Sequence, residues 1–402
     1  MKKFEKVTMA NFRSKDYLLA NPDARLAMEN QQFDQAYQHF LSVKEQHTRY
    51  QYLTKSVEEC PPILLQGNNP ENLLSLIDEP LEDLSKYLGG DYSNVYAPLN
   101  FINMEKLGVS SQFLEDCAIY HKNYFNIESG KFHYQKVMDI PLTQFVKPTI
   151  LDLGSGSGKS VFACCELFDG CSILATDISH ELLKILVKYK KEYYPSSRIE
   201  AVAMDALHTR LRPSSFDIFT GFAILHHLVD IDLVFQTAYS ALRENGCVFF
   251  FEPMLSGYIV VISLLKLLLK RNEHSSYLFR KNKLSRKIVN FFMAVIWDWT
   301  ERINSYNKME HVRITDLDDK WIFTRQFIET AAKEAGFRYV EIVSINEPPR
   351  YKHELTWMLR TIEVDFADLP KWAKEIVDSF DEGDILCGKN DIILSAGVIC
   401  RK

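Results

Sequence analysis

The stretch TILDLGSGSG, residues 149–158, decides the fold of this chain. It begins as an apolar run that ends at Asp152, and it then places glycines at positions 154, 156 and 158. A glycine adopts positive φ without strain, so such a loop would also suit an ordinary tight turn. Between a strand and a helix, however, the same loop lets a bound group approach the backbone closely. The segments that follow distinguish the two interpretations.

Short β-rich runs alternate with amphipathic helical segments after this loop. We expect strands at 149–153, 172–176, 199–203, 216–220 and 247–251, and helices at 158–168, 179–193 and 230–243. Such alternation predicts a parallel sheet that is covered by helices on both faces. A helix at 324–336, ending at Gly336, and strands at 337–345 and 391–400 complete the pattern. The predicted fold class is therefore α/β, with a doubly wound, mostly parallel, seven-stranded sheet.

Two other regions depart from this alternation. Residues 1–145 show helical periodicity broken at proline and glycine pairs, which predicts a helical N-terminal domain. Residues 146–402 are then the sheet domain, with a helical insertion at about 256–320. Residues 258–310 are apolar and basic, with ten Lys or Arg and four acidic residues. This composition would suit contact with an acidic or lipidic substrate or with the surface of a membrane, but the preferred interpretation is a lid or a homodimer helix with solvated charges.

The overall composition limits the class of protein. A chain of 402 residues with 47% hydrophobic residues can bury a large core. The net charge of −6 argues against general nucleic-acid binding. The first residues contain no apolar signal segment, so a cytoplasmic location is expected. The eight cysteines form no CxxC pair and no spacing typical of metal ligands, and we expect no metal.

Acidic residues stand at the ends of three successive predicted strands. Asp152 ends the first strand, Asp177 ends the second, and Asp205 follows the third. Ligands bind at the carboxyl ends of the strands in an open α/β sheet, and an acid at the end of the second strand is placed to accept hydrogen bonds from ribose hydroxyls. Asp205 could accept one from the amino group of adenine. Carboxylates here favour a positively charged ligand over one that carries phosphates.

These motifs resemble those of the class I S-adenosylmethionine-dependent methyltransferases. The matching segments are LDLGSGSG, Asp177, Met204-Asp205-Ala206, GFAILHHLVD, FFFEP and TRQFIETAAKEAGF. The resemblance covers about residues 148–252 and 322–345. It implies S-adenosyl-L-methionine as cofactor and S-adenosyl-L-homocysteine as product. The cofactor-binding residues that it implies are Asp152, Gly154, Ser155, Gly156, Gly158, Asp177, Ile178, Asp205, Ala206, Gly221 and Phe222, with Tyr134 as a lid.

Three polar residues are candidates for work on the methyl acceptor. His226 and His227 follow the fourth strand, and Glu252 ends the fifth. A histidine can take a proton from a hydroxyl or an amine near neutral pH. The alternative is that one histidine packs against or caps the next helix, for which Asp230 is the better cap. Tyr134 could likewise be a surface residue rather than a lid.

The sequence therefore predicts an enzyme that methylates an O, N or C nucleophile of a small hydrophobic or amphipathic molecule. One alternative is a nicotinamide-dependent oxidoreductase, which shares the sheet and the ribose-binding acid. Another is a regulatory or assembly protein that binds the cofactor without turnover. No motif selects the acceptor.

Overall fold

A computed structural model gives the fold. It describes residues 63–68, 70–102, 113–138, 143–208, 210–274, 283–308, 319–384 and 392–402, and before residue 63 only positions 4–6, 17, 21, 24, 27, 41–42 and 50–52. The chain divides into two compact units. One comprises Pro62–Glu347 and Ile393–Lys402, and the other comprises Met1–Pro61 and Pro348–Ile392.

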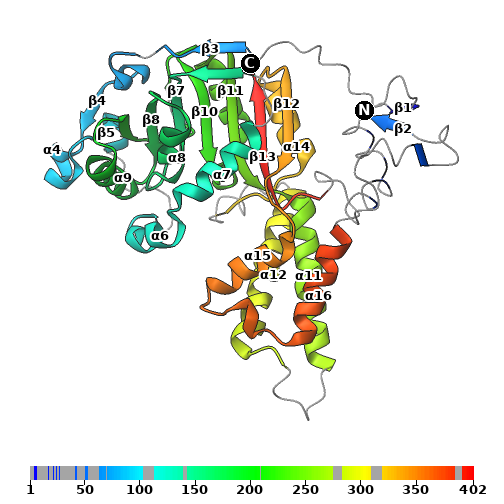
Figure 1. Ribbon diagram of the computed structural model, residues 1–402. Helices are drawn as coiled ribbons and strands as arrows, with labels where there is room; N and C mark the ends of the chain where they lie inside the picture. The colour runs from blue at the N-terminus through cyan, green and yellow to red at the C-terminus, as the bar shows by residue number, and fades with distance from the viewer. Residues whose placement is uncertain are drawn as a thin grey trace. The chain divides into compact units, whose positions relative to one another are not determined.

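A nine-stranded mixed sheet forms the centre of the larger unit (Figure 1). Its strands lie in the order β12-β13-β11-β10-β7-β8-β9-β5-β4. They are β4 (Leu81–Asp83), β5 (Val95–Pro98), β7 (Thr149–Leu153), β8 (Ser172–Asp177), β9 (Arg198–Ala203), β10 (Phe216–Phe222), β11 (Leu242–Pro253), β12 (Tyr339–Ser344) and β13 (Ser395–Arg401). The strands from β11 to β5 run parallel, whereas β13 is antiparallel to both β11 and β12, and β4 is antiparallel to β5.

The expected strand count of seven is corrected to nine. All seven expected strands are present, and β5 and β4 extend the sheet beyond β9. These two strands have four and three residues, so they are too short to show an alternating pattern. Because they come from the first 145 residues, the helical N-terminal domain is not confirmed, and the boundary at 145 stays a prediction. There are also two two-stranded sheets among the described residues, β3 (Ile63–Gln66) with β6 (Thr143–Val146) and β1 (Phe4–Lys6) with β2 (Tyr50–Tyr52).

Helices cover both faces of the nine-stranded sheet. On one face lie α10 (Ile231–Ala241) and α14 (Arg325–Glu334), and on the other lie α7 (Ile127–Met138), α8 (Lys159–Leu167) and α9 (His180–Tyr193). Side chains of β11 alternate between these faces: Phe250 joins the α10 side, and Phe249 and Phe251 join the α7 side. Burial of one such phenylalanine contributes about 2 kcal/mol. The sheet is therefore packed on both of its faces.

Polar caps fix the ends of the predicted helices. Ser179 accepts a hydrogen bond from the Leu182 amide at the start of α9, and Asp230 accepts one from the Leu233 amide at the start of α10. These contacts satisfy amides that have no partner within the helix. Gly336 follows α14 with φ of 111°, as expected for a residue that ends a helix. The expectation that Asp230 is a cap is confirmed.

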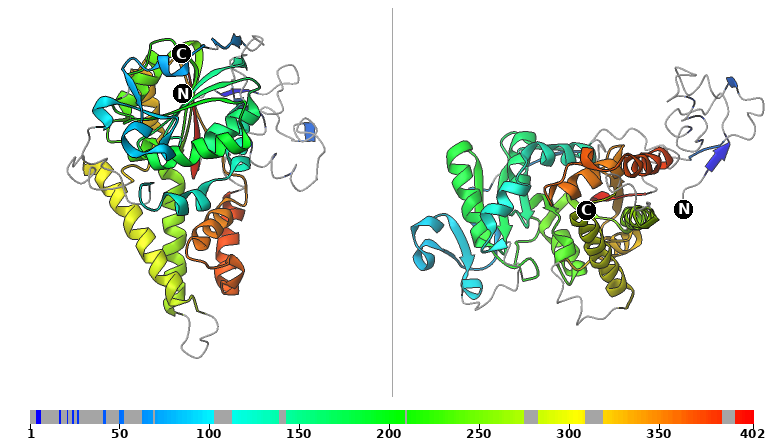
Figure 2. Two further views of the ribbon diagram at one scale, coloured as in Figure 1. Left: turned by 90° about the vertical axis from the view of Figure 1, so that its left-hand side faces the viewer. Right: turned by 90° about the horizontal axis from the view of Figure 1, so that it is seen from below.

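Two long helices form the insertion after β11. They are α11 (Leu255–His274) and α12 (Arg286–Lys308), which contact each other and extend away from the sheet (Figures 1 and 2). The ring centroids of Tyr258 and Trp299 lie 4.2 Å apart between the two helices. Among the described residues, no helix is both long and apolar enough to cross a membrane.

The smaller unit contains α15 (Arg350–Arg360) and α16 (Lys371–Asp384). The Asp381 carboxylate accepts hydrogen bonds from the Tyr351 and Lys352 amides, which joins the two helices. The remaining short helices are η2 (Leu73–Leu76), α4 (Ser85–Leu88), η3 (Gly90–Tyr92), α5 (Leu99–Ile102), α6 (Cys117–Tyr124), η5 (Leu225–His227) and η7 (Phe366–Asp368).

Candidate functional site

The glycine loop after β7 holds three residues at positive φ. The φ angles are 67° at Gly154, 52° at Gly156 and 102° at Gly158. A Cβ at Gly154 would lie 2.7 Å from the Ile224 side chain, and one at Gly158 would lie 2.5 Å from the Phe162 ring. A Cβ at Gly156 would meet only the Tyr120 ring, at 4.0 Å. Gly154 and Gly158 are thus required by packing, whereas Gly156 keeps open the space above the loop.

Asp152 is a buried carboxylate beneath this loop. It is 1% exposed, and its Oδ2 accepts a hydrogen bond of 2.6 Å from the Ser160 hydroxyl. Its Oδ1 has no hydrogen-bond partner among the described residues. Burial raises the pKa of Asp152 to about 7, although hydrogen bonds from Ser160 and Ser155 oppose that shift. Ser155 also donates from its hydroxyl to the Asp152 carbonyl at 2.9 Å, which holds the loop to the strand end.

Asp177, at the end of β8, ties this strand to the loop. Its Oδ2 accepts a hydrogen bond of 2.7 Å from the Gly156 amide, and its Oδ1 accepts one of 2.7 Å from the Ser179 amide. Burial raises its pKa to about 6, and these amides lower it. Asp152 and Asp177 also raise the cost of charging each other, because the Asp177 charge raises the pKa of Asp152. A cation bound near them would relieve this repulsion.

Asp205 follows β9, the next strand along the sheet. One of its carboxylate oxygens accepts a hydrogen bond of 2.9 Å from the Leu207 amide, and the other lies 2.9 Å from Nδ1 of His208. Ala206 packs at the edge of the core on the α10 side, and Ile178 packs on the opposite side. The predicted acids at strand ends thus lie on adjacent strands, as the sequence indicates.

The position of Tyr134 against β10 corrects one prediction. Tyr134 lies in α7, is 0% exposed and shares a hydrogen bond of 2.8 Å with the Thr220 hydroxyl. It is therefore neither a lid nor a surface residue, because packing against β10 encloses its ring. Phe222 stacks on Phe251 with 4.1 Å between ring centroids. A Cβ at Gly221 would lie 3.0 Å from the Leu153 carbonyl, so close strand packing requires glycine there.

Tyr120 of helix α6 and Phe113, which precedes that helix, are aromatic residues that sequence analysis missed. The Tyr120 ring is the group nearest to the Cβ position of Gly156, and its centroid lies 5.2 Å from that of Phe113. Burial raises the pKa of Tyr120, and so do the charges of Asp177 and Asp319. Tyr120 therefore lies near both the glycine loop and the histidine pair. Only long-range packing reveals this, since Tyr120 belongs to no motif.

His226 is fixed by Glu252. These residues are 8% and 1% exposed, and Nδ1 of His226 lies 2.7 Å from Oε2 of Glu252. The other Glu252 oxygen accepts hydrogen bonds from the Ile224 and Leu225 amides, at 3.0 and 2.8 Å. Burial alone would lower the pKa of His226, but the charges of Glu252 and Asp319 outweigh it and raise the pKa. Glu252 thus fixes both the turn η5 and the first histidine.

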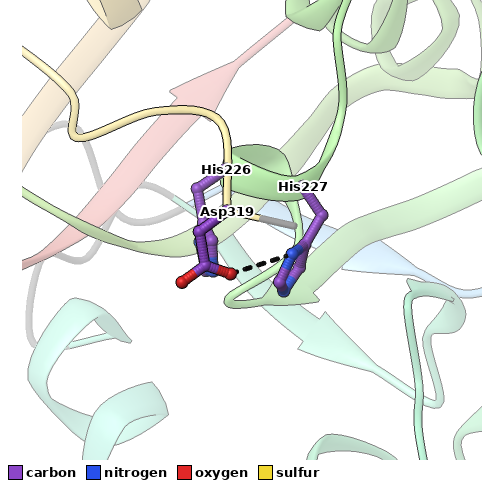
Figure 3. Close-up of side chains that lie close together, drawn as sticks. All are labelled: His226, His227 and Asp319. Carbon is purple, nitrogen blue, oxygen red and sulfur yellow. Dashed lines mark ion pairs between the residues drawn. The ribbon is translucent and has the colours of Figure 1, made fainter. Parts of the chain in front are cut away.

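His227 meets a second carboxylate, Asp319, which sequence analysis also missed. Nδ1 of His227 lies 3.2 Å from Oδ1 of Asp319, and Nε2 of His226 lies 3.7 Å from the same oxygen (Figure 3). The other Asp319 oxygen pairs with Arg302 of α12 at 2.7 Å. Burial would raise the pKa of Asp319, but the two histidines and Arg302 lower it. The His227 ring also meets Phe113 edge to face, with 5.7 Å between centroids.

The three side chains in Figure 3 are also a donor set of the kind that binds a divalent cation. Their ligand atoms all lie within 4.8 Å of one another. Arg302, however, already pairs with Asp319, and its positive charge opposes a second cation there. We therefore describe the group as an ion-pair cluster. The sequence alone gives little indication of this cluster, because Asp319 lies far along the chain from the two histidines.

Comparison with known proteins agrees with this geometry. Residues 150–246 match the family model described as "Methyltransferase domain". A ubiquinone biosynthesis O-methyltransferase of Paraburkholderia phymatum is 29% identical over 101 residues, which are 25% of this chain and 42% of that protein. The chain thus matches less than half the length of this relative.

Solved structures of methyltransferases are also similar in part. Phosphoethanolamine N-methyltransferase 2 of Haemonchus contortus, in complex with S-adenosyl-L-methionine, has 16% identity and a TM-score of 0.43. The match covers 79% of this chain and 59% of that one. A SAM-dependent methyltransferase of Archaeoglobus fulgidus has 14% identity and a TM-score of 0.38, with 71% and 98% covered.

Residues 150–246 therefore match a methyltransferase domain, and the class I resemblance described above implies S-adenosylmethionine as its cofactor. The residues present fit that cofactor on two observations. The Cβ position of Gly156 is open toward Tyr120, and Asp152 is a buried carboxylate with one oxygen unbonded among the described residues. Both features suit a cationic ligand that lies close to the backbone.

Proposed function

We propose that this protein transfers a methyl group from S-adenosyl-L-methionine to a nucleophile of a small hydrophobic or amphipathic molecule. The observation that carries the proposal is the Asp177 carboxylate, which lies at a strand end and accepts the Gly156 amide at 2.7 Å. This contact places a carboxylate beside the open part of the loop. Asp205, on the adjacent strand, extends the acidic edge. A ribose and an adenine would find acceptors on successive strands there.

Each part of the loop has its own role in binding. Gly154, Gly158 and Ser155 hold its shape, Gly156 leaves room for the ligand, and Asp152 supplies a buried carboxylate whose ionised form a cationic ligand would stabilise. Ile178 and Ala206 would provide apolar contacts beside the two acids. When bound, the cofactor supplies an electrophilic methyl group on a positively charged sulfur. No observation supports a nicotinamide-dependent oxidoreductase or a protein without turnover, and a pyrophosphate would meet repulsion from these acids.

Of the adjacent histidines, His227 is the one that we propose to contact the acceptor. His226 is 8% exposed and directs Nδ1 at Glu252, so its role is to hold the turn. His227 is more open, with a side chain that is 24% exposed, and has Asp319 at Nδ1. Its Nε2 can take the proton of an acceptor while Asp319 stabilises the imidazolium. A hydroxyl acceptor suits this role, because it loses its proton on methyl transfer and Nε2 of His227 can take that proton.

The surface of the insertion supports a lipidic or membrane-bound acceptor. Four large apolar side chains of α11 and α12 are exposed, and basic residues are interspersed with them. They are Ile259 (48% exposed), Leu267 (43%), Met293 (59%) and Trp297 (68%). Exposed Lys266, Lys270 and Arg286 lie on the same two helices. Apolar and basic side chains together are typical of helices that bind the interface of an anionic bilayer.

Cofactor binding and methyl transfer can be tested one after the other. Calorimetry should show one site for S-adenosyl-L-methionine and for S-adenosyl-L-homocysteine, and none for NADH. The protein and radiolabelled cofactor are then incubated with a panel of phenols, amines and lipid extracts. Labelled product in the phenol or lipid fractions supports the proposal. Saturable binding of NADH without binding of the methyl donor would refute it.

A further inference from the structure

Two charged residues, Arg302 and Asp319, connect the insertion after β11 to His227. Arg302 lies in α12 and pairs with Oδ2 of Asp319 at 2.7 Å, and Oδ1 of Asp319 lies 3.2 Å from Nδ1 of His227. Arg302 also pairs with Asp298, one helical turn earlier on α12. A continuous series of ion pairs therefore connects α12 to the turn that carries the histidines.

We infer that Arg302 and Asp319 are positioning residues, which fix the tautomer of His227 and set the pH at which it gains a proton. The inference deepens the proposed function, on which the catalytic meaning of His227 rests. It also gives the insertion a role toward the histidine pair. Neither residue is placed in contact with the acceptor.

The tautomer follows from the chemistry of the contacts. An ionised carboxylate only accepts hydrogen bonds, so the nitrogen that faces Oδ1 of Asp319 must carry the hydrogen. This gives His227 the tautomer with hydrogen on Nδ1, and Nε2 then carries the lone pair that a proton acceptor needs. Arg302 restrains the carboxylate by pairing with Oδ2, and Oδ1 then faces Nδ1 of His227 at 3.2 Å, with Nε2 of His226 further away at 3.7 Å. Loss of either contact would let the Asp319 carboxylate rotate.

The charges around His227 are balanced so that one more proton can be held. Among the described residues, the charged and titratable groups around it include Asp319, His226, Glu252, Arg302, Asp298 and Tyr120. With a proton on His226, Glu252 and His226 form one neutral pair, Asp319 and Arg302 form another, and Asp298 adds one negative charge. A proton on His227 is then stabilised by an Asp319 charge that Arg302 partly offsets.

Substitutions of Asp319 and Arg302 are therefore expected to shift the titration of His227 in opposite directions. Asp319→Asn removes the negative neighbour and should lower the pH at which His227 titrates by about one unit. Arg302→Gln removes the cation that offsets Asp319 and should raise that pH by roughly half a unit. Arg302→Lys keeps the charge but loses the paired geometry of the guanidinium, so the titration should stay near that of the unchanged protein. A purely structural role predicts no such change of sign.

The experiment is an NMR titration of the full chain labelled with ¹⁵N-histidine. His227→Gln assigns the signals of His227, and two-bond correlations from ring protons to ring nitrogens report which nitrogen carries the hydrogen. Lys333→Gln is the matched control, since Lys333 is 63% exposed and pairs with Glu329 on the distant helix α14. It should leave the His227 signals unchanged.

The inference is supported if His227 carries its hydrogen on Nδ1 and the Asp319 and Arg302 variants shift its titration in opposite directions. It is overturned if both variants, folded by circular dichroism, shift it the same way or not at all. Zinc chloride added at one equivalent provides a second check. Saturable shifts of His226 and His227 that Asp319→Asn abolishes would mean a metal site and would also overturn it. Because no methyl donor is present, the outcome is independent of the calorimetric test of the proposed function.

Discussion

Asp177 of β8 accepts a hydrogen bond of 2.7 Å from the amide of Gly156, which lies in the loop after β7. The contact joins the ends of two neighbouring parallel strands at the point where the glycine loop is most open. It makes the shape of the loop depend on a carboxylate that would also bind the ligand. The first prediction follows from this double role.

Asp177→Asn should weaken the binding of S-adenosyl-L-methionine at least about tenfold, because the amide cannot replace an ionised acceptor that faces two amides and that we propose to bind the ribose. Calorimetry measures the affinity. Asp169→Asn is the control, since Asp169 is an exposed carboxylate just before β8, at the opposite end of that strand. Equal affinities of the two variants would contradict the role of Asp177.

Gly156→Ala should mainly affect cofactor binding, whereas Gly158→Ala should mainly affect stability. A Cβ at Gly156 meets nothing closer than 4.0 Å, so only the positive φ costs stability, by about 1 kcal/mol. A Cβ at Gly158 would lie 2.5 Å from the Phe162 ring and should cost more. Urea unfolding and calorimetry together should show weaker cofactor binding with near-normal stability in Gly156→Ala. They should show a clear loss of stability in Gly158→Ala.

The free energy of unfolding should depend on pH through Asp152. Its pKa is about 7 in the folded protein and about 3.9 in an unfolded chain. A raised folded-state pKa means that the stabilising contribution is complete below about pH 4 and is lost as the pH rises to about 7. Between pH 5 and 7.5 the free energy of unfolding should fall by about 2 kcal/mol, which corresponds to roughly one to two pKa units. Urea unfolding at both pH values measures it.

Asp152→Asn removes this titrating group while keeping an oxygen for the Ser160 hydroxyl. The variant should therefore lose less stability than the unchanged protein over the same pH interval. The comparison isolates Asp152 from the histidines, which titrate in the same interval in both proteins. An identical pH dependence of the two proteins would show that Asp152 is not the source.

His226→Leu and His227→Leu should have different effects on stability. Removal of His226 leaves one oxygen of the buried Glu252 carboxylate without its imidazole partner, which should cost about 2 to 4 kcal/mol. His227 faces Asp319, which keeps its pairing with Arg302, so its removal should cost less than about 1 kcal/mol. The midpoint of urea unfolding distinguishes them. A larger loss in His227→Leu would reverse the assigned roles.

Vesicle binding tests the surface of the insertion. Sedimentation with vesicles of phosphatidylglycerol should carry the protein down, and neutral phosphatidylcholine vesicles should not. Trp297→Ala should reduce the bound fraction several-fold, because an exposed tryptophan of α12 would enter the interface. Trp357→Ala is the matched control, since Trp357 of α15 is 52% exposed outside the insertion. Equal losses in the two variants would argue against the proposed surface.

The parts of this fold that sequence analysis predicts are those with local signals. The strands from β7 to β11 and the helices between them follow from alternating hydrophobic patterns, and Asp230 and Gly336 mark helix ends by known preferences. The short strands β4 and β5 give no periodic signal, and their place in the sheet depends on pairing with β9. That pairing is a tertiary interaction.

The residues of the candidate site also divide into those with a local sequence signal and those without one. Asp152, Asp177 and the glycines belong to one short motif and the strand after it, so spacing alone indicates them. Tyr120, Arg302 and Asp319 come from segments that precede or follow the alternating pattern, and only folding brings them close to the histidines. Tyr134 was predicted wrongly because its helix packs against β10 with the tyrosine inward.

The pairing of β5 with β9 also limits how this protein can be shortened. A chain cut at residue 145 would lose β4 and β5, and the backbone amides and carbonyls of β9 along that side would face water. Strands exposed in this way pair with other molecules, so the shortened protein would be prone to self-association. An expression fragment that starts at residue 62 keeps both strands and is the safer choice for crystallisation of the larger unit.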